Sequence, residues 1–220
     1  MGLLVTILFT FLSGDTVPRI VALGDSITRG ERAGVKATQT FPAQLHKTLS
    51  KDGVATVVLN LGVGGQRTDQ AIKRLAEVAK YKPKIVTIMY GTNDSYVDVG
   101  AKEPRITADE YRKNLTTLVK EFRKVGTTPI LMTPPRWGDK AKATGIGEHP
   151  NVKLEAYVKV CREVARETNT PLVDHFAHWT KANADGTDVG AWTTDQCHPN
   201  ATGHREIVRL LAPIVREALK

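Results

Sequence analysis

Short, almost purely apolar runs alternate with longer amphipathic segments along most of the chain, and this alternation limits the folds it can adopt. Each run is rich in β-branched residues and is bounded by Gly, Pro, Asn or Asp, as strands commonly are. The runs do not alternate apolar with polar positions, so we expect strands covered on both faces, as in a parallel sheet. Five strands are predicted, at residues 20–23, 54–59, 85–89, 129–132 and 171–173.

Amphipathic helices are predicted between these strands. The clearest covers residues 107–125, where apolar side chains recur at helical spacing. Thr107 and Glu110 form a capping-box pattern at its start, and Gly126 follows its end. Further helices are predicted at residues 41–49, 68–79, 152–168 and 201–219, and Pro213 is expected to disturb the last of them.

Strands and helices in this order predict an α/β fold, with an open parallel sheet and helices on both faces. No repeat, linker or low-complexity segment interrupts the pattern, so we expect residues 15–220 to form a single domain. The longest irregular stretches, at residues 94–104, 134–150 and 177–199, all follow strands. Ligands bind outside the carboxyl ends of the strands in such folds, so we expect the substrate site there.

The first residues need a separate interpretation. Residues 2–12 are almost continuously apolar and are followed by Ser13 and Gly14, as in the core and cleavage site of a signal peptide. No Lys or Arg precedes Arg19, so the basic start of such a peptide is missing, and a buried strand or a misassigned start are the alternatives. We interpret residues 1–14 as a signal peptide for export, with a cytoplasmic location as the alternative. We expect no stable membrane span.

The composition is that of a globular protein. The 220 residues are 41% hydrophobic and 25% charged, and the formal net charge is +8, from 31 basic and 23 acidic residues. The Lys and Arg residues are spread along the chain, without a basic run or a basic stripe interleaved with aromatic residues. We therefore predict no nucleic-acid partner. The oligomeric state stays open.

The cysteines and most of the histidines give no metal signature. Cys161 and Cys197 lie far apart and form no CxxC motif, so a disulfide in an exported protein and two buried thiols are both compatible. His175 and His178 form an HxxH pattern without the glutamate of a zinc-protease motif. We interpret them as ordinary loop or helix residues and His204 as structural. No metal and no organic cofactor are predicted.

Loops after the first three strands carry candidate catalytic groups. Residues 24–28, Gly-Asp-Ser-Ile-Thr, place Ser26 at a strand's carboxyl end, as a nucleophile or simply as a helix cap. Residues 60–65, Asn-Leu-Gly-Val-Gly-Gly, lack the third glycine of a dinucleotide fingerprint because Arg67 occupies its position. A loop that approaches an anionic oxygen and a plain turn both remain. Asn93, in Gly-Thr-Asn-Asp, is a neutral donor suited to an oxyanion but also a common turn residue.

A candidate general base precedes the last helix. Asp195 and His198 are three residues apart, so one turn can direct the carboxylate at one imidazole nitrogen while the other nitrogen faces Ser26. Asn200 is positioned to cap the helix that follows. Asp174 is a rival carboxylate, but no base is placed beside it as His198 is placed beside Asp195. Together the four motifs supply a nucleophile, oxyanion donors, a base and a residue that orients it.

These four blocks, in this order, resemble those of the SGNH hydrolase (GDSL-type esterase/lipase) superfamily. They extend over residues 24–200, nearly all of the chain outside the predicted leader. The resemblance implies a three-layer α/β/α flavodoxin-like fold with a five-stranded parallel sheet. It also implies a catalytic triad of Ser26, His198 and Asp195.

The resemblance further implies an oxyanion hole. Its donors would be the backbone N–H groups of Ser26 and a loop glycine, and the side-chain amide of Asn93. In the family pattern the glycine lies five residues after the Asn that ends the second strand, which selects Gly65 over Gly62.

The predicted function is therefore ester hydrolysis through an acyl-enzyme, without a cofactor. The absence of a long hydrophobic lid favours short acyl groups, and export with a basic charge favours O-acetyl esters of a carbohydrate. Trp137, Trp179 and Trp192 are candidates to line the substrate pocket. The alternatives are a lysophospholipase or thioesterase, a non-catalytic carbohydrate- or lipid-binding module on the same fold, and a nucleotide-binding flavodoxin-like protein, which the missing phosphate fingerprint disfavours.

Overall fold

A computed structural model of the protein describes residues 17–220, and the predicted leader at residues 1–14 lies outside them. All five strands are parallel and form one sheet in the order β2-β1-β3-β4-β5, the order of a flavodoxin-like fold. The prediction of a five-stranded parallel sheet is confirmed. The strands are β1 (Arg19–Gly24), β2 (Val57–Asn60), β3 (Ile85–Met89), β4 (Thr128–Thr133) and β5 (Leu172–Asp174).

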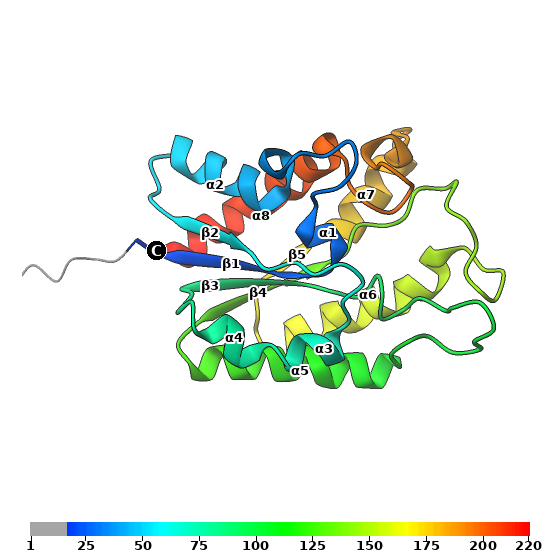
Figure 1. Cartoon of the computed structure of the whole chain (residues 1–220), viewed down its shortest axis with the longest axis horizontal. Coiled ribbons are helices and arrows are strands. Elements are labelled where there is room, and N and C mark those ends of the chain that lie inside the picture. Colours follow the sequence, from blue (N-terminus) through cyan, green and yellow to red (C-terminus); the bar gives the residue numbers. More distant parts are fainter. Residues whose placement is uncertain (1–16) are drawn as a thin grey trace, which may run out of the picture.

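Helices cover both faces of the sheet, which is seen edge-on between them in Figure 1. Two helices, α2 (Phe41–Lys51) and α8 (Ala201–Leu219), pack together on one face. The opposite face is covered by α3 (Thr68–Ile72), α4 (Leu75–Ala79), α5 (Ala108–Lys124) and α6 (Pro150–Glu167). The three-layer arrangement agrees with the α/β/α fold that the resemblance implied.

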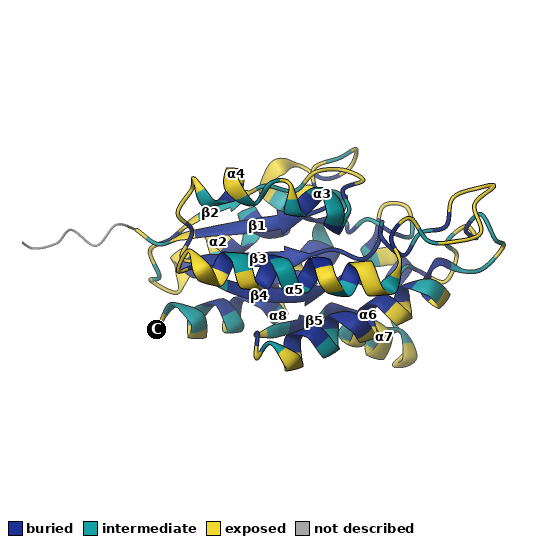
Figure 2. Ribbon diagram, turned by 90° about the horizontal axis from the view of Figure 1, so that it is seen from below, coloured by how far each residue is buried: buried dark blue, intermediate teal, exposed yellow. Residues whose placement is uncertain are grey.

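Both faces of the central strands are buried, which explains why the strands are apolar throughout. Val21 and Leu23 of β1 belong to the core beneath α5 and α6, whereas Ile20 and Ala22 belong to the core beneath α2 and α8. Figure 2 shows β1, β3 and β4 as mostly buried, while α5 presents an exposed outer face and a buried inner one. Among residues 17–220, no helix is both long enough and apolar enough to cross a bilayer.

Helix boundaries follow the predicted capping signals in most places. The Thr107 hydroxyl accepts a hydrogen bond from the Glu110 backbone N–H (3.2 Å) at the start of α5. Gly126, with φ of +76°, follows its end. The helix predicted at residues 68–79 is instead divided into α3 and α4.

Two further predictions about helices were wrong. Pro213 does not interrupt α8, because the apolar face of that helix is buried on either side of it, at Ile207, Leu211 and Val215. The stretch 177–199, predicted as irregular, contains most of α7 (His175–Ala184) and the short 3₁₀ helix η2 (Val189–Trp192).

The carboxyl ends of the strands all face one end of the molecule. The short helix α1 (Ser26–Arg29) begins there after β1, and the long connections after β3 and β4 extend beyond the same end of the sheet (Figure 1). The fold therefore brings the four candidate motifs to one edge, as parallel strands require.

Candidate active site

Ser26 is held at the start of α1 by the residue before it. The Asp25 carboxylate accepts a hydrogen bond from the Ile27 backbone N–H (2.8 Å) and so caps the helix. Gly24 precedes this turn, and a Cβ there would lie 2.0 Å from Thr28 Oγ1. The Ser26 backbone N–H makes no hydrogen bond to any group within residues 17–220. It stands at a helix N-terminus, where an anionic oxygen is favoured.

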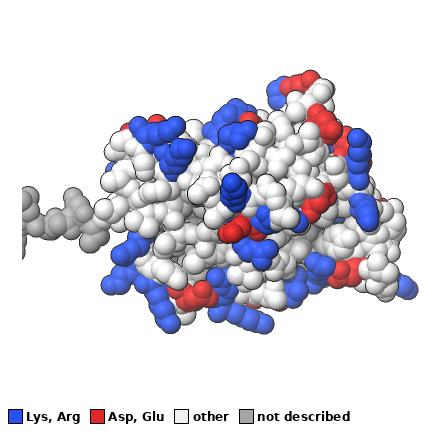
Figure 3. Space-filling view, turned by 45° about the horizontal axis from the view of Figure 1, so that its top comes forward, with Lys and Arg blue, Asp and Glu red and all other residues white. Residues whose placement is uncertain are grey.

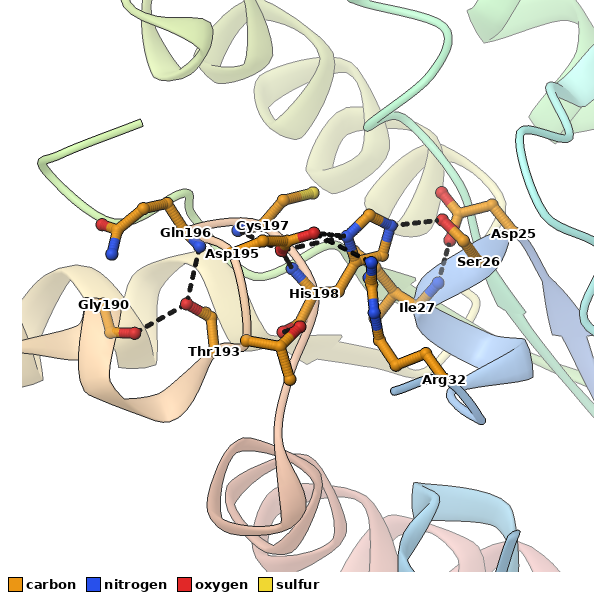
Figure 4. A network of polar contacts seen from close by, with 11 residues as sticks. Asp25, Ser26, Ile27, Arg32, Gly190, Thr193, Asp195, Gln196, Cys197 and His198 are labelled. Carbon is orange, nitrogen blue, oxygen red and sulfur yellow. Dashed lines mark hydrogen bonds and ion pairs between the residues drawn. The ribbon is translucent and has the colours of Figure 1, made fainter. Parts of the chain in front are cut away.

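The structure brings together the three residues predicted as the triad. Ser26 Oγ lies 2.9 Å from His198 Nε2, and His198 Nδ1 lies 2.8 Å from Asp195 Oδ2 (Figure 4). The Asp195 carboxylate also accepts a hydrogen bond from the His198 backbone N–H (2.8 Å). One carboxylate therefore fixes both the ring and the main chain of the histidine.

The loop that carries Asp195 and His198 is tied at its base. Thr193 and Pro199 form an antiparallel bridge, and the Thr194 N–H donates to the His198 carbonyl (2.8 Å). Asn200 then caps α8, as predicted, by accepting hydrogen bonds from the next turn, and its amide donates to the Ala191 carbonyl (2.8 Å). These contacts hold the imidazole in place without help from a ligand.

The electrostatics suit His198 as a base. Burial lowers its pKa below the usual value, although the Asp195 carboxylate opposes this effect. Burial disfavours ionisation of Asp195, but hydrogen bonds from the His198 backbone and ring outweigh it, and the pKa of Asp195 lies below its usual range. At neutral pH the pair is therefore a neutral imidazole beside a carboxylate, the protonation state that accepts a proton from serine.

Asn93 lies beside Ser26, where an oxyanion donor was predicted. Its Nδ2 donates to Asp25 Oδ2 (3.1 Å) and to the Gln66 carbonyl (3.3 Å), and its Oδ1 accepts from Arg105 (3.3 Å). Burial raises the pKa of Asp25 to about 7, although the Ile27 backbone N–H and the Asn93 amide favour its charged form. A buried carboxyl group thus joins the turn of Ser26 to the side chain of Asn93.

A second buried carboxyl group anchors the loop of Asn93. Asp94 Oδ1 accepts hydrogen bonds from the backbone N–H (2.9 Å) and hydroxyl (2.5 Å) of Thr68, the first residue of α3. Burial raises the pKa of Asp94 to about 6, against these hydrogen bonds. Neither Asp25 nor Asp94 was predicted to have a role, although each stands within one of the candidate motifs.

The glycine loop packs directly on α1. The Gly62 N–H donates to Asn60 Oδ1 (3.0 Å), and a Cβ at Gly62 would lie 2.1 Å from the Arg29 backbone nitrogen. Gly65 is exposed with φ of +73°, and its N–H makes no hydrogen bond within residues 17–220. Of these two glycines, only Gly65 has an N–H that is free to bind an oxyanion, although Gly65 is not part of the pocket lining described next.

A pocket of about 410 Å³ opens at Ser26. On one side, the Tyr96 and Trp137 rings stack with centroids 6.2 Å apart, and the Arg105 guanidinium lies over Tyr96 at 5.0 Å. Arg105 is in turn paired with Asp98. The lining is Ser26, Thr92, Asn93, Tyr96, Asp98, Val99, Arg105, Trp137, Cys197 and His198.

Two of the three tryptophans do not line this pocket, and neither cysteine is a reactive thiol. Trp179 is fully buried and packs edge-on against Trp192 with centroids 5.1 Å apart, so of the three tryptophans only Trp137 lines the pocket. Cys161 and Cys197 are both free and buried. Burial raises the pKa of the Cys161 thiol to about 12 and that of Cys197 well above its usual value. Neither is a candidate nucleophile.

The remaining polar candidates have structural roles. Within residues 17–220, no group of three or more His, Cys, Asp or Glu side chains is arranged to hold a metal ion. His178 contacts Glu206 (2.9 Å), and His204 Nδ1 accepts a hydrogen bond from the Phe41 N–H (3.2 Å). Asp174 caps α7 and pairs with Arg162 (2.7 Å), so it is not a rival to Asp195.

Comparison with known proteins agrees with this geometry. The model of the GDSL-like Lipase/Acylhydrolase family matches residues 22–206. The chain belongs to this family. It is therefore an ester-hydrolysing enzyme of the SGNH/GDSL superfamily.

Three relatives indicate the range of this similarity. The uncharacterized lipoprotein YqeF of Bacillus subtilis is 33% identical over 182 residues, covering 74% of this chain and 73% of that protein. The isoamyl acetate-hydrolyzing esterase 1 homolog of Rattus norvegicus is 28% identical over 214 residues, covering 90% and 81%. The crystal structure of a catalytic mutant of an acetylxylan esterase from Geobacillus stearothermophilus superposes with a TM-score of 0.73 at 26% identity, covering 91% and 94%.

Proposed function

We propose that this enzyme hydrolyses esters of short acyl groups, with O-acetyl groups on carbohydrate as the favoured substrate. The observation that carries the proposal is the chain of hydrogen bonds from Ser26 through His198 to Asp195, which ends at the mouth of a pocket. Neither a binding module nor a nucleotide-binding protein requires a serine hydroxyl hydrogen-bonded to a neutral imidazole.

In the proposed mechanism, Ser26 Oγ attacks the ester carbonyl while His198 Nε2 accepts its proton. Asp195 stabilises the imidazolium that forms. The oxyanion is bound by the backbone N–H groups of Ser26 and Gly65 and by Asn93 Nδ2. Asn93 Nδ2 donates to Asp25 Oδ2 and, over a longer contact, to the Gln66 carbonyl, so the hydrogen on the Gln66 side is the one that we assign to the oxyanion.

His198 then protonates the leaving alcohol, which departs and leaves the acyl group on Ser26. A water molecule, deprotonated by the same imidazole, attacks the acyl-enzyme, and the collapse of the second tetrahedral intermediate releases the acid and restores the serine hydroxyl. No step needs a metal or an organic cofactor. The place of Gly65 among the donors rests on the family spacing and on its free N–H.

The pocket supports the choice of substrate. Its volume of about 410 Å³ is at the small end for ligand sites, and its lining mixes aromatic with charged side chains. The flat face of Trp137 and Tyr96 suits the apolar face of a sugar ring, and the Arg105–Asp98 pair can hydrogen-bond hydroxyl groups. Relatives are named for esters of acetate, on xylan or on isoamyl alcohol, so the acetyl group is their shared part.

The first experiment compares p-nitrophenyl acetate with p-nitrophenyl octanoate, using the wild type, Ser26→Ala and Ser50→Ala. Ser50 is exposed on α2, so its variant controls for loss of a hydroxyl. We expect hydrolysis of the acetate ester to exceed that of the octanoate ester, to vanish in Ser26→Ala and to persist in Ser50→Ala. Faster hydrolysis of octanoate would favour the lysophospholipase or thioesterase alternative.

The natural alcohol is tested by acetate release from acetylated xylooligosaccharides and from isoamyl acetate. Higher kcat/KM on the oligosaccharide supports the proposal. Higher kcat/KM on isoamyl acetate would indicate that the natural substrate is a small volatile ester instead of an acetylated carbohydrate. A folded wild type with no activity on any of these esters would favour the non-catalytic binding module.

The site of action is proposed to be outside the cytoplasm. The support is the apolar run at residues 2–12 and the name lipoprotein given to the Bacillus subtilis relative. Fractionation of an expressing bacterium, with the mass of the recovered protein, tests this. Processed protein outside the cytoplasm, lacking the residues before about position 15, is expected, and full-length protein confined to the cytoplasm would refute it.

A further inference from the structure

Arg32 makes a contact with the proposed triad that sequence analysis did not anticipate. Its guanidinium nitrogen lies 2.9 Å from Asp195 Oδ2, the same oxygen that lies 2.8 Å from His198 Nδ1 (Figure 4). Because the two contacts share one oxygen, the arginine charge lies within about 6 Å of the ring nitrogen. The two residues of this ion pair are 163 positions apart in the chain.

The main chain around Arg32 is held in place. The Arg32 N–H donates to the Val35 carbonyl (3.2 Å), and the Val35 N–H donates to the Arg32 carbonyl (2.9 Å), which closes a tight turn. Val35 is buried and anchors this turn, while the Arg32 side chain is 29% exposed. The guanidinium is therefore presented to Asp195 from a fixed loop rather than from a freely moving one.

The charged groups that act on His198 come from two segments of the chain. Asp195 is on its own loop, whereas Arg32 and Arg29 follow from the Ser26 turn. Burial is the largest cause that lowers the pKa of His198. The Asp195 carboxylate acts against it, and the charges of the two arginines lower this pKa further. The Arg29 guanidinium is directed at the glycine loop, since it lies 3.2 Å from where a Cβ of Gly64 would be. Arg32 is the cation in direct contact with the triad carboxylate.

We propose that Arg32 is a positioning residue, which fixes the Asp195 carboxylate against His198 and sets the pH at which this histidine becomes a free base. The inference rests on the proposed function of the triad. Arg32 does not line the pocket, so it acts through Asp195 and not on the substrate. A cation beside Asp195 offsets part of the charge that would otherwise hold a proton on His198, and the enzyme stays active at lower pH.

The test compares pH profiles of kcat/KM for p-nitrophenyl acetate in Arg32→Gln, Arg32→Lys and Arg112→Gln. Arg112 is paired with Glu163 and Glu167 on the far helices, so its variant makes the same charge change away from the site. In Arg32→Gln we expect the acidic limb to move up by about 0.5–1 pH unit, the effect of one charge at this distance under partial screening. At pH values below this limb, kcat/KM of Arg32→Gln should then be about 3–10-fold lower than that of the wild type. KM should not change.

Arg32→Lys keeps the positive charge, so its acidic limb should lie close to that of the wild type. Arg112→Gln should leave the profile unchanged. An acidic limb in Arg32→Gln that coincides with the wild type would overturn the proposal, as would an equal shift in Arg112→Gln. The pKa of His198, followed by NMR of its ring protons, is a readout that does not need activity. If no ester is hydrolysed but this pKa rises in Arg32→Gln, the proposed function fails while the role of Arg32 stands.

Discussion

Replacing Gly62 by alanine should lower the activity, although Gly62 does not line the pocket. A Cβ at this position would lie 2.1 Å from the Arg29 nitrogen, and 2.7 Å from both Arg29 Cα and the Thr28 carbonyl carbon. All three atoms belong to the main chain of α1, so no side chain can turn away. Since ordinary contact begins near 3.4 Å, the loop and the helix must separate by about 1 Å or more.

This separation acts on the proposed nucleophile because α1 begins with Ser26, whose hydroxyl lies 2.9 Å from His198 Nε2. A displacement of about 1 Å in a catalytic group costs on the order of 100-fold in rate. Overpacking of a tight contact costs about 1–3 kcal/mol of unfolding free energy. For a chain of this size, that corresponds to a fall in Tm of about 3–10 °C.

The assay is kcat/KM on p-nitrophenyl acetate together with Tm, and Gly64→Ala is the matched control. A Cβ at Gly64 meets only the end of the Arg29 side chain, at 3.2 Å, which can move aside. Gly64→Ala should therefore stay close to the wild type in both measurements. A Gly62→Ala enzyme with wild-type rate and Tm would show that the loop can accept a Cβ without displacing α1.

Four further outcomes follow from individual contacts. Asn93→Ala should lower kcat on p-nitrophenyl acetate by about 100–1000-fold, and an unchanged rate would remove this amide from the oxyanion hole. Burial lowers the pKa of His175 to about 3, so as pH falls below 6.5 the unfolded chain gains a proton that the folded chain refuses, and stability drops. His175→Leu should remove this loss. In urea titrations, the unfolding free energy of the variant minus that of the wild type should be about 2–3 kcal/mol larger at pH 4 than at pH 7, and a difference that does not change with pH would contradict this. Cys161 and Cys197 should react with a thiol reagent only after denaturation, and rapid labelling of either one in the native enzyme would contradict their burial. Trp137→Ala should raise KM for an acetylated oligosaccharide more than KM for p-nitrophenyl acetate, and equal effects would place the sugar elsewhere.

Most of the fold was predictable because its central strands are buried on both faces and its edge strands are also largely apolar. Such strands have short, continuous apolar sequences. The bounds of all five were predicted to within three residues of the observed ones. The helix α7 was missed because its polar and apolar residues do not separate into two clear faces. Its start is nevertheless signalled by Asp174, whose side chain accepts the Ala177 N–H and caps the helix.

The charge distribution agrees with the expectation from the sequence on the face shown in Figure 3. Basic side chains there lie in separate groups with acidic ones between them, and no continuous basic surface is visible. Because the opposite charges are interspersed, their fields cancel over short distances. The net charge of +8 is therefore compatible with a neutral substrate such as an acetylated sugar.

The site divides into a part that is local in sequence and a part that only packing creates. Asp195 and His198 could be paired from their spacing, and Ser26 and Asn93 from their places after strands. The ion pair of Arg32 could not, because any of the dispersed arginines could have met the triad, and which one does depends on how the loop after α1 is folded.

The contact between Asp25 and Asn93 has a mechanical consequence for the site. Asp25 accepts a hydrogen bond from Ile27 of the nucleophile turn and another from the proposed oxyanion donor, so one side chain spans the ends of β1 and β3. Because this carboxyl group is buried and has a pKa near 7, losing either partner leaves a polar group unsatisfied away from water, at a cost of about 1–3 kcal/mol. Moving the Ser26 turn without Asn93 therefore carries this cost, which favours a fixed relative position of the proposed nucleophile and the proposed oxyanion donor.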